Sequence, residues 1–299
     1  MRELVIISGK GGTGKTSLTA AFASLAENML LCDADVDAAD LHLLMKPTVR
    51  QRSDFQGGHQ AVINRSQCCE CGICLDLCRF DAISTDYEVD GISCEGCGVC
   101  VDFCPLKAID FPIKTCGEWF ISETRLGPLV HARLGIAEEN SGRLVSLVRQ
   151  ESKKRAEALN RGMIITDGPP GIGCPVIASI TDATALVVVA EPTVSGVHDM
   201  ERVIQLAAGF RIPVMICINK YDLNPEQTLA IEAFSKEKEI RFLGKIPYNP
   251  VFTKAMIQGE TIFEYDPDSD VCQAVTEIWD NIITAPEMNY LAHLEFSFN

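Results

Sequence analysis

A glycine-rich segment near the N-terminus constrains the fold of this chain more than any other feature of the sequence. It follows the apolar run Leu4 to Ile7, precedes a helical pattern that begins at Ser17, and reads Gly9-Lys10-Gly11-Gly12-Thr13-Gly14-Lys15-Thr16. In such a loop the backbone N–H groups turn around phosphate oxygens, and the helix N-terminus adds partial positive charge. Lys15 is expected to reach the β- and γ-phosphates and Thr16 to ligate Mg²⁺. The sequence therefore predicts a strand–loop–helix unit that binds a nucleoside triphosphate.

The chain alternates short apolar runs with longer amphipathic segments, apart from a cysteine-rich stretch in its first half. Buried parallel strands connected by helices produce this pattern. Strands are predicted at Leu4–Ile7, Met29–Cys32, Met163–Thr166, Ala185–Ala190, Val214–Ile218 and Arg241–Ile246. Helices are predicted at Thr16–Glu27, Gly142–Leu159, Gly196–Ala208, Pro225–Lys238 and Ser269–Ile283. The expected fold class is α/β, with the mostly parallel sheet of a P-loop NTPase.

Nine of the fourteen cysteines lie between Cys68 and Cys104, and eight of them follow two copies of one spacing. The runs are Cys68-x2-Cys71-x2-Cys74-x3-Cys78 and Cys94-x2-Cys97-x2-Cys100-x3-Cys104-Pro105. Bacterial ferredoxins with two [4Fe–4S] clusters have this spacing, and the fourth cysteine of each run ligates the other cluster. The predicted ligand sets are Cys68, Cys71, Cys74 and Cys104 for one cluster, and Cys94, Cys97, Cys100 and Cys78 for the other.

Two alternatives to these ligand sets stay open. Zinc is less favoured, because zinc motifs place a dozen or more residues between two C-x2-C pairs. A shifted register would use Cys69 instead of Cys68, although Cys68 preserves the spacing. The segment between the second and third predicted strands is too long for one crossover connection. We therefore predict an inserted 2[4Fe–4S] ferredoxin-like α+β domain at residues 64–113, and a discontinuous P-loop domain at residues 1–63 and 114–299.

Charge and hydropathy exclude several classes of partner. The formal net charge of −15 repels the phosphates of nucleic acids and anionic lipid headgroups, so we expect neither nucleic acid nor membrane as a partner. The apolar runs have the length of strands, too short to span a bilayer. No export signal precedes the glycine-rich segment, and a cytosolic chain keeps its thiols reduced. The protein is expected in the cytoplasm.

Lys10 makes the phosphate loop similar to the deviant Walker A motif of the MinD, ParA, Mrp and nitrogenase iron-protein group of ATPases. This resemblance implies a nucleotide-sandwich homodimer in which Lys10 reaches the partner's phosphates. It also implies that Asp33 helps the Mg²⁺ shell or a switch and that Asp35 orients the attacking water, or the reverse. The segment Asp167-Gly168-Pro169-Pro170-Gly171 resembles the family's second switch, so Asp167 is expected to act on Mg²⁺ through water.

The quartet Asn219-Lys220-Tyr221-Asp222 closes the fifth predicted strand and is expected to contact the base. An N-K-x-D quartet reads guanine in GTPases, whereas the resembled ATPases use the asparagine amide alone. ATP is favoured because a loop with Lys10 belongs to the ATP-using branch. The turn Ile246-Pro247-Tyr248-Asn249 is a further candidate to flank the base.

Taken together, the chain resembles MinD-superfamily P-loop ATPases that carry an inserted ferredoxin domain. The leading hypothesis is a homodimeric ATPase that couples ATP turnover to electron transfer through two [4Fe–4S] clusters, toward a redox or cluster-acceptor protein. An Mrp-like scaffold for metal clusters is the alternative, with Cys174 as its substitute for the missing C-x-x-C pair. A MinD-like positioning role is less favoured, because Pro286–Asn299 contains no Lys or Arg to form a membrane-binding tail.

Overall fold

The computed structural model describes residues 1–135 and 141–289, which form two compact units. Unit 1 contains Met1–Arg52, Trp119–Arg133 and the chain from Ser141 onward. Unit 2 contains Ser53–Glu118 and a short segment that begins at Leu134. The predicted insert, residues 64–113, lies within unit 2, which extends beyond it on both sides.

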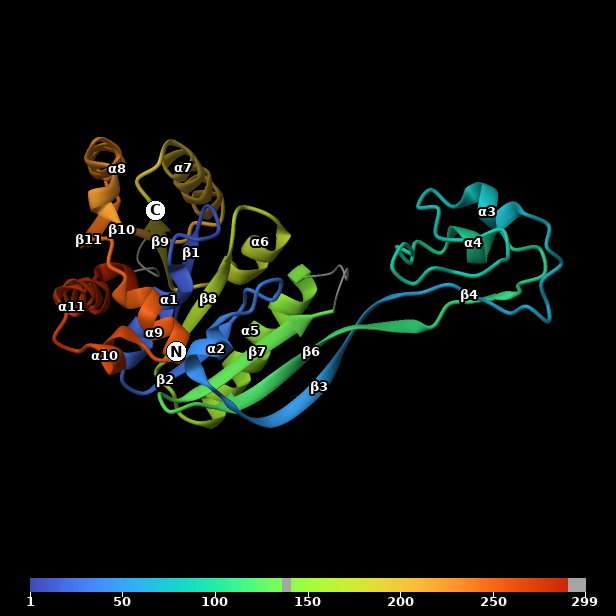
Figure 1. The fold of residues 1–299 in the computed structure, drawn as a ribbon, viewed down its shortest axis with the longest axis horizontal. Helices are drawn as coiled ribbons and strands as arrows, with labels where there is room; N and C mark the ends of the chain where they lie inside the picture. Colours follow the sequence, from blue (N-terminus) through green and yellow to red (C-terminus); the bar gives the residue numbers. More distant parts are fainter. Residues whose placement is uncertain (136–140, 290–299) are drawn as a thin grey trace, which may run out of the picture. The chain divides into compact units, whose positions relative to one another are not determined.

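A nine-stranded sheet forms the frame of unit 1 (Figure 1). Its order is β11 (Arg241–Ile246), β10 (Val214–Asn219), β9 (Ala185–Ala190), β1 (Arg2–Ser8), β8 (Met163–Pro170), β2 (Met29–Asp33), β7 (Pro128–Leu134), β6 (Ile113–Glu123) and β3 (Thr48–His59). The pairs that join β11 through β7 are all parallel. The predicted α/β fold with a mostly parallel sheet is thereby confirmed.

The helices of unit 1 include every helix that the sequence predicts, with ends shifted by one or two residues. They are α1 (Lys15–Leu25), α2 (Leu41–Met45), α5 (Ser141–Ala158), α6 (Cys174–Ile180), α7 (Val194–Gly209), α8 (Pro225–Glu237), α9 (Val251–Gln258), α10 (Ile262–Tyr265) and α11 (Asp270–Ile283). Two short 3-10 helices, Tyr221–Leu223 and Pro286–Met288, complete the set. The sequence analysis missed α2, α6, α9 and α10, which are all eight residues or shorter.

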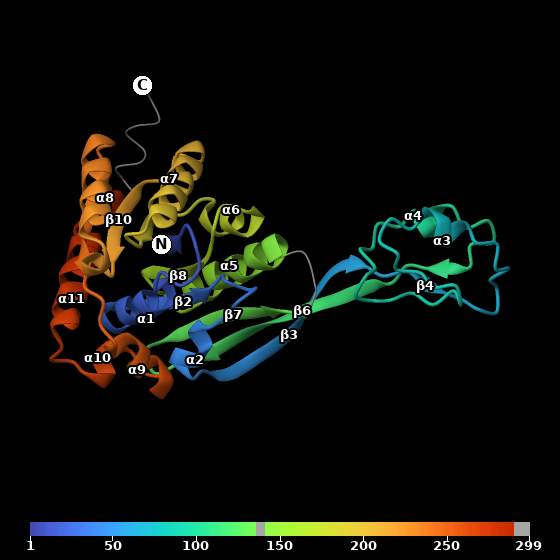
Figure 2. The same ribbon diagram turned by 45° about the horizontal axis from the view of Figure 1, so that its top comes forward.

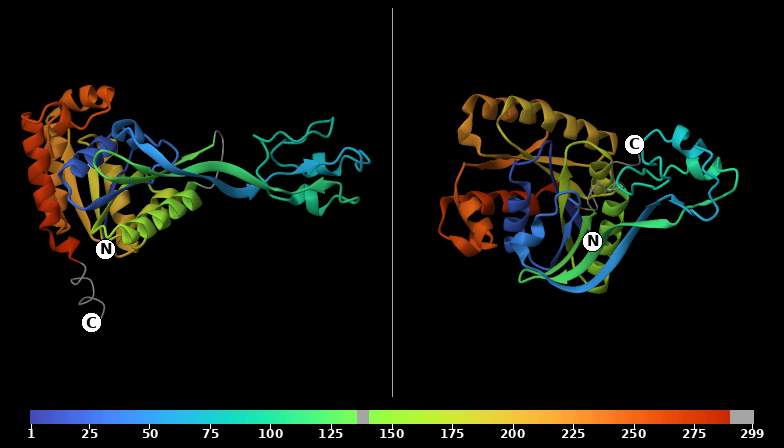
Figure 3. Two further views of the ribbon diagram at one scale, coloured as in Figure 1. Left: turned by 90° about the horizontal axis from the view of Figure 1, so that it is seen from below. Right: turned by 45° about the vertical axis from the view of Figure 1, so that its right-hand side comes forward.

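Three strands, β3, β6 and β7, were also missed. In β3 only Phe55 and Gly57 are buried, so the strand lacks the apolar run by which the others were recognised. Its polar composition suits its place at the edge of the sheet. Figures 1, 2 and 3 show β3 and β6 side by side, and the N–H of Gln60 donates to the carbonyl of Pro112 just past their ends (3.1 Å).

The sheet separates the core of unit 1 into two layers, and successive side chains of β1 point alternately into one layer and the other. Leu4 and Ile6 pack in one cluster with residues of α1 and α11, among them Phe22 and Trp279. Val5 and Ile7 pack in a second cluster with α6, α7 and α8. Because both faces of β1 are covered, the strand holds the phosphate loop that follows it on a rigid support.

Unit 2 is built from two equivalent halves. Its strands β4 (Val62–Ile63) and β5 (Ile109–Asp110) pair antiparallel, and Ile63 lies opposite Ile109. Val89 of the second half and Ile83 of the first half, which correspond to Ile63 and Ile109, form an antiparallel bridge. Helix α3 (Ile73–Leu77) in the first half corresponds to α4 (Val99–Asp102) in the second. The duplication noted in the sequence is therefore also a duplication of structure.

Hydrogen bonds cross between these halves in a reciprocal pattern. The N–H of Asn64 donates to the carbonyl of Ala108 (2.8 Å), and the N–H of Asp90 donates to the carbonyl of Ala82 (2.8 Å). Asn64 and Asp90 occupy equivalent positions, as do Ala82 and Ala108. The first residues of each half thus bind the end of the other half, so neither half can form these hydrogen bonds alone.

No helix among the described residues is long and apolar enough to cross a membrane. The expectation about the C-terminal tail concerns Pro286–Asn299, of which residues 290–299 lie outside the described residues.

A buried ion pair holds α5 against β1. The Arg149 guanidinium donates to both carboxylate oxygens of Glu3 (2.8 and 2.7 Å) and to the carbonyls of Ala178 and Thr181 at the end of α6 (2.8 Å each). Arg149 is 6% exposed and Glu3 4%. Removal of one partner would leave an uncompensated buried charge.

We predict that Arg149→Ala lowers the free energy of unfolding by about 3–5 kcal/mol, as expected when a buried pair loses one partner. Lys153 also lies near Glu3 (3.4 Å), but its side chain is 38% exposed. Lys153→Ala is therefore the control and should cost less than about 1 kcal/mol. Urea titrations followed by circular dichroism measure both. Equal losses of unfolding free energy in the two variants would show that the Arg149–Glu3 pair is not the main contact between α5 and β1.

Candidate functional site

A cavity of about 380 Å³ opens at the carboxyl edge of the sheet in unit 1. This volume lies in the range of pockets that hold small-molecule ligands. The lining residues come from the phosphate loop and four other segments: Ser8, Gly11–Ser17, Asp35, Ala38, Asp40, Pro170, Asn219, Lys220, Pro247–Asn249, Phe252, Thr253 and Met256. Most of the predicted nucleotide-binding residues thus meet in one place, although Gly9, Lys10, Asp33, Asp167 and Asp222 do not line the cavity.

Lys15 begins α1 at the floor of the cavity and is almost completely buried. Its Nζ lies 2.8 Å from Asp167 Oδ1 and 3.3 Å from Asp35 Oδ2. Burial by itself disfavours the charged amine, but the carboxylates of Asp167 and Asp35 outweigh it and raise the pKa of Lys15. The ammonium group is therefore charged where phosphate would enter.

Asp167, within β8, connects Lys15 to the first turns of α1. Its Oδ2 accepts from the Thr16 hydroxyl (2.7 Å), and its Oδ1 accepts from the Thr19 hydroxyl (3.0 Å). Thr16 and Asp167 are the two residues that the sequence analysis assigned to Mg²⁺, so the structure places the proposed ligands next to each other. A hydroxyl and a carboxylate are oxygen donors of the kind Mg²⁺ prefers.

Asp33 and Asp35 differ in their surroundings. Asp33 is completely buried, and its Oδ1 accepts from the backbone N–H of Asp35 (3.2 Å). Burial first, and then the nearby charge of Asp167, raise the pKa of Asp33 well above its ordinary value. Burial also raises the pKa of Asp35, whose side chain lines the cavity. Of the two, Asp35 is the carboxylate placed to meet a ligand.

Three buried side-chain oxygens around the loop have no hydrogen-bond partner among the described residues. They are Thr13 Oγ1, Asp33 Oδ2 and Asn219 Oδ1. A buried polar atom without a partner costs free energy, and such atoms are expected where a ligand, an ion or water completes the site. The site therefore suits a polar ligand that both donates and accepts hydrogen bonds.

Two residues of the quartet predicted to contact the base, Asn219 and Lys220, bind carbonyl groups of the phosphate loop. The side-chain amide of Asn219 donates to the carbonyl of Thr13 (2.7 Å), and Lys220 Nζ donates to the carbonyl of Gly12 (2.9 Å). A side chain at Gly14 would collide with the Asn219 amide, which explains the glycine there. Asp222 instead accepts from the backbone N–H of Tyr248 (2.6 Å) and fixes the turn after β11.

Lys10, within the loop, forms an ion pair that the sequence analysis did not anticipate. Its Nζ contacts Glu191 Oε2 (2.8 Å) and donates to Thr193 Oγ1 (3.0 Å). The other oxygen of Glu191 contacts Lys220 Nζ (3.0 Å). The position of Glu191 directly after an apolar strand could have indicated it, because functional residues collect at that edge of a parallel sheet.

One wall of the cavity consists of residues from the turn after β11 and from helix α9.

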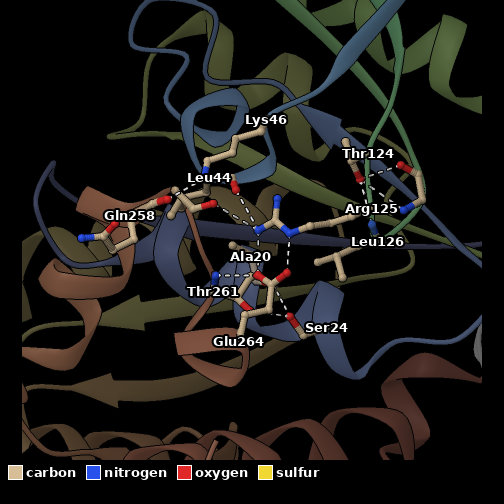
Figure 4. Close-up of polar contacts among 12 residues, drawn as sticks. Ala20, Ser24, Leu44, Lys46, Thr124, Arg125, Leu126, Gln258, Thr261 and Glu264 are labelled. Atoms are coloured by element: carbon tan, nitrogen blue, oxygen red, sulfur yellow. Dashed lines mark hydrogen bonds and ion pairs between the residues drawn. The ribbon is translucent and has the colours of Figure 1, made fainter. Parts of the chain in front are cut away.

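Arg125 and Lys46 connect the helices near this wall. Arg125, between β6 and β7, forms a two-point ion pair with Glu264 of α10 and donates to the carbonyl of Leu44 at the end of α2 (2.9 Å; Figure 4). Lys46 donates to the carbonyl of Gln258 at the end of α9 (2.6 Å). These contacts tie the helix after Asp33–Asp40 to the helix that lines the cavity.

The Arg125–Glu264 pair makes stability depend on pH. Hydrogen bonds from Arg125 lower the pKa of Glu264 to about 2 from its ordinary 4.5. A carboxyl group with a depressed pKa stabilises the fold above its unfolded-state pKa, and this contribution is lost as the pH falls toward the folded-state value.

We therefore predict that Glu264→Gln lowers the free energy of unfolding at pH 7 by about 1.5 kcal/mol, and that the difference from wild type shrinks between pH 4.5 and 2. Urea titrations at several pH values measure this. Glu237→Gln, which alters a carboxylate with a 71% exposed side chain, is the control and should differ little at any pH. A difference that stays constant with pH would contradict the assignment.

Unit 2 contains two further cavities, each lined by cysteines from both sequence runs. One is lined by Cys68, Cys69, Cys71, Cys74 and Cys104, together with Tyr87 and several apolar residues. The other is lined by Cys78, Cys94, Cys97 and Cys100, together with Phe80 and Phe111. The crossed grouping places Cys104 with the first run and Cys78 with the second.

Among the described residues, no group of three or more His, Cys, Asp or Glu side chains is arranged to hold a metal ion. The four thiolates of a [4Fe–4S] cluster bind four different iron atoms at the corners of a cube, so they stand further apart than the ligands of a single ion.

The parallel sheet, the glycine-rich loop before α1 and the buried Lys15 with its two carboxylates define a P-loop nucleotide-binding protein. A family model described as the CobQ/CobB/MinD/ParA nucleotide binding domain, CbiA, matches residues 4–262. The chain belongs to this family. MinD and ParA proteins are P-loop ATPases, which confirms the nucleotide-binding and ATPase-family part of the sequence prediction.

Relatives and solved structures agree with this assignment. The uncharacterized protein MJ0578 of Methanocaldococcus jannaschii is 33% identical over 285 residues, which cover 94% of this chain and 96% of the relative. The septum site-determining protein MinD of Pyrococcus horikoshii, complexed with Mg-ADP, matches with a TM-score of 0.59 and 18% identity, covering 98% of each chain. The MinC:MinD cell division protein complex of Aquifex aeolicus matches with a TM-score of 0.58 and 20% identity, covering 95% of this chain and 97% of that one.

Proposed function

We propose that this protein is an ATP-dependent homodimer that couples ATP binding and hydrolysis to electron transfer through two [4Fe–4S] clusters in unit 2. The observation that carries the proposal is the grouping of the eight motif cysteines into two cavities with one cysteine of each run exchanged. The family assignment concerns nucleotide binding. The clusters, the electron transfer and the homodimer are inferences from the residues.

The base contact supports ATP over GTP. The amide nitrogen of Asn219 is engaged with the carbonyl of Thr13, so Oδ1 is the free side of the group and has no partner among the described residues. A free acceptor suits the amino group of adenine, whereas guanine presents an acceptor, O6, at that position. Asp222, which reads guanine in N-K-x-D proteins, is engaged with Tyr248 and does not line the cavity.

The residues at the phosphate loop fit Mg-ATP. Lys15 would contact the β- and γ-phosphates and Thr16 would hold Mg²⁺, with Asp167 beside it. Asp35, which lines the cavity, is the residue placed to orient the attacking water, and Lys10 would act across the dimer. Mg²⁺ supplies neutralisation of the developing phosphate charge when bound.

The lining of the two cysteine cavities supports the proposal of two cubic clusters. Each is closed by apolar and aromatic side chains, and the Tyr87 hydroxyl above the first cavity donates to the carbonyl of Glu70 (2.6 Å). Apolar surroundings exclude water, which is one of the means by which proteins set cluster potentials. Unit 2 would therefore hold two redox centres with different surroundings.

The path of the chain supports a coupling between the nucleotide and unit 2. After Asp33–Asp37 the chain forms α2 and then enters β3, which runs from unit 1 into unit 2. The chain returns through β6 to Arg125, which binds the end of α2. A displacement of α2 on ATP binding would thus act on both strands that lead to the clusters.

We predict that Lys15→Ala abolishes ATP binding and hydrolysis, because the buried cation that faces the phosphates is lost. Isothermal titration with ATP and GTP measures binding, and phosphate release measures turnover. Lys153→Ala, a lysine on α5 away from the cavity, is the control and should bind normally. Undiminished hydrolysis in Lys15→Ala, or tighter binding of GTP than of ATP by wild type, would refute the site assignment.

A separate prediction tests the clusters. Anaerobic reconstitution should give about eight irons per wild-type chain, as two four-iron clusters require. Cys104→Ser should lose the cluster of the first run, whereas Cys69→Ser is the control and should retain both. Iron analysis and EPR of the reduced protein, with and without ATP, provide the readout. Iron-free wild type, or EPR signals that never respond to ATP, would refute the proposal, and transfer of iron to an apo-acceptor would favour the scaffold alternative.

A further inference from the structure

Glu191 holds two lysines that belong to the nucleotide site. Its Oε2 lies 2.8 Å from Lys10 Nζ, and its Oε1 lies 3.0 Å from Lys220 Nζ. Lys220 also donates to the carbonyl of Gly12, and Lys10 also donates to Thr193 Oγ1 (3.0 Å). One carboxylate therefore bridges the two cations that flank the phosphate loop.

This bridge stands on rigid elements. Glu191 directly follows β9, whose neighbour in the sheet is β1, the strand that leads into the loop. Thr193 caps α7, since its Oγ1 accepts from the backbone N–H of Gly196 (3.0 Å). Because Glu191 and Thr193 are both fixed by the ends of regular elements, Lys10 is held at a defined place within its own subunit.

The environment strengthens the bridge. The Glu191 side chain is 15% exposed and that of Lys10 is 29% exposed, so water screens the pair less than it would screen an ion pair on an open surface. The bonds from Lys10 and Lys220 overcome the effect of burial and lower the pKa of Glu191. The carboxylate is therefore charged at neutral pH and competes with any other anion for Lys10.

We propose that Glu191 is a positioning residue that retains Lys10 in its own subunit until the phosphates of a bound nucleotide compete for it. This inference rests on the proposed function, in which ATP brings two copies of the chain together and Lys10 acts across their interface. The hold by Glu191 then opposes dimerisation, and the charge of ATP must overcome it. Glu191 thus sets the ATP concentration at which the dimer forms.

The first test measures dimerisation by analytical ultracentrifugation against the concentration of a non-hydrolysable ATP analogue. Glu191→Gln, which keeps the size of the side chain, should lower the concentration needed for half-maximal dimerisation about fivefold. The matched control is Glu232→Gln, which removes an ion pair with Lys245 (2.8 Å) and should leave it unchanged. An unchanged value for Glu191→Gln would overturn the inference.

A second variant separates the two arms of the bridge. Lys220→Met removes the contact of Glu191 with Lys220 but leaves Lys10 with its carboxylate. If this variant reproduces the effect of Glu191→Gln, the effect passes through Lys220 and the loop, and the inference is wrong. If only Glu191→Gln lowers the analogue concentration for half-maximal dimerisation, the contact of Glu191 with Lys10 is the cause.

The last test needs neither nucleotide nor dimer. Acetic anhydride is applied to the nucleotide-free protein, and acetylation of Lys10 is followed by mass spectrometry, with Lys245 in the same sample as reference. Glu191→Gln should accelerate acetylation of Lys10 about fivefold, because the side chain is released, and equal rates would overturn the inference. Wild type that stays monomeric with the ATP analogue would refute the proposed homodimer, whereas the acetylation rates still decide whether Glu191 holds Lys10.

Discussion

The buried ammonium of Lys15 is the interaction on which the nucleotide site depends. A lysine that is only 6% exposed is unfavourable unless anions compensate it. Here Asp167, within β8, and Asp35, just after β2, provide the compensating charges. Their positions require β8 to lie between β1 and β2 in the sheet, as observed. The charge of Lys15 thereby holds the start of α1 against two segments, those of Asp35 and Asp167, that are expected to respond to phosphate. It can do so only with this order of strands in the sheet.

Each basic residue of the nucleotide site forms an ion pair with a carboxylate of the same chain. Lys15 is held by carboxylates, and Lys10 and Lys220 share Glu191, so each cation near the loop has an anionic partner within the chain. A nucleotide would have to replace these partners. Exchange of partners, rather than movement of a large domain, is a direct way for phosphate charge to reach α2 and α7, because Asp35 and Glu191 stand just before those helices.

Unit 2 obeys a different constraint. Its halves are short, and its small apolar core is lined by partly buried cysteines, among them Cys78, Cys94, Cys100 and Cys104. So small a core supplies little stability, and domains of this size commonly need a metal group or cross-links. The reciprocal hydrogen bonds of Asn64 and Asp90 hold the two halves of unit 2 together in part. This physical need, together with the cysteine spacing, motivates the proposal of two clusters.

The sequence by itself determined the parallel α/β frame, the phosphate loop and the neighbours Thr16 and Asp167, because apolar runs and loop glycines are local signals. Strand β3 escaped notice since a polar edge strand has no such signal, and β6, its neighbour in the sheet, has only two buried residues. Only the tertiary structure decided that Asp222 fixes a turn, that α9 lines the cavity and that Glu191 bridges Lys10 and Lys220. These are contacts between segments far apart in the chain, and their geometry depends on how the strands are ordered in the sheet, which no local pattern encodes.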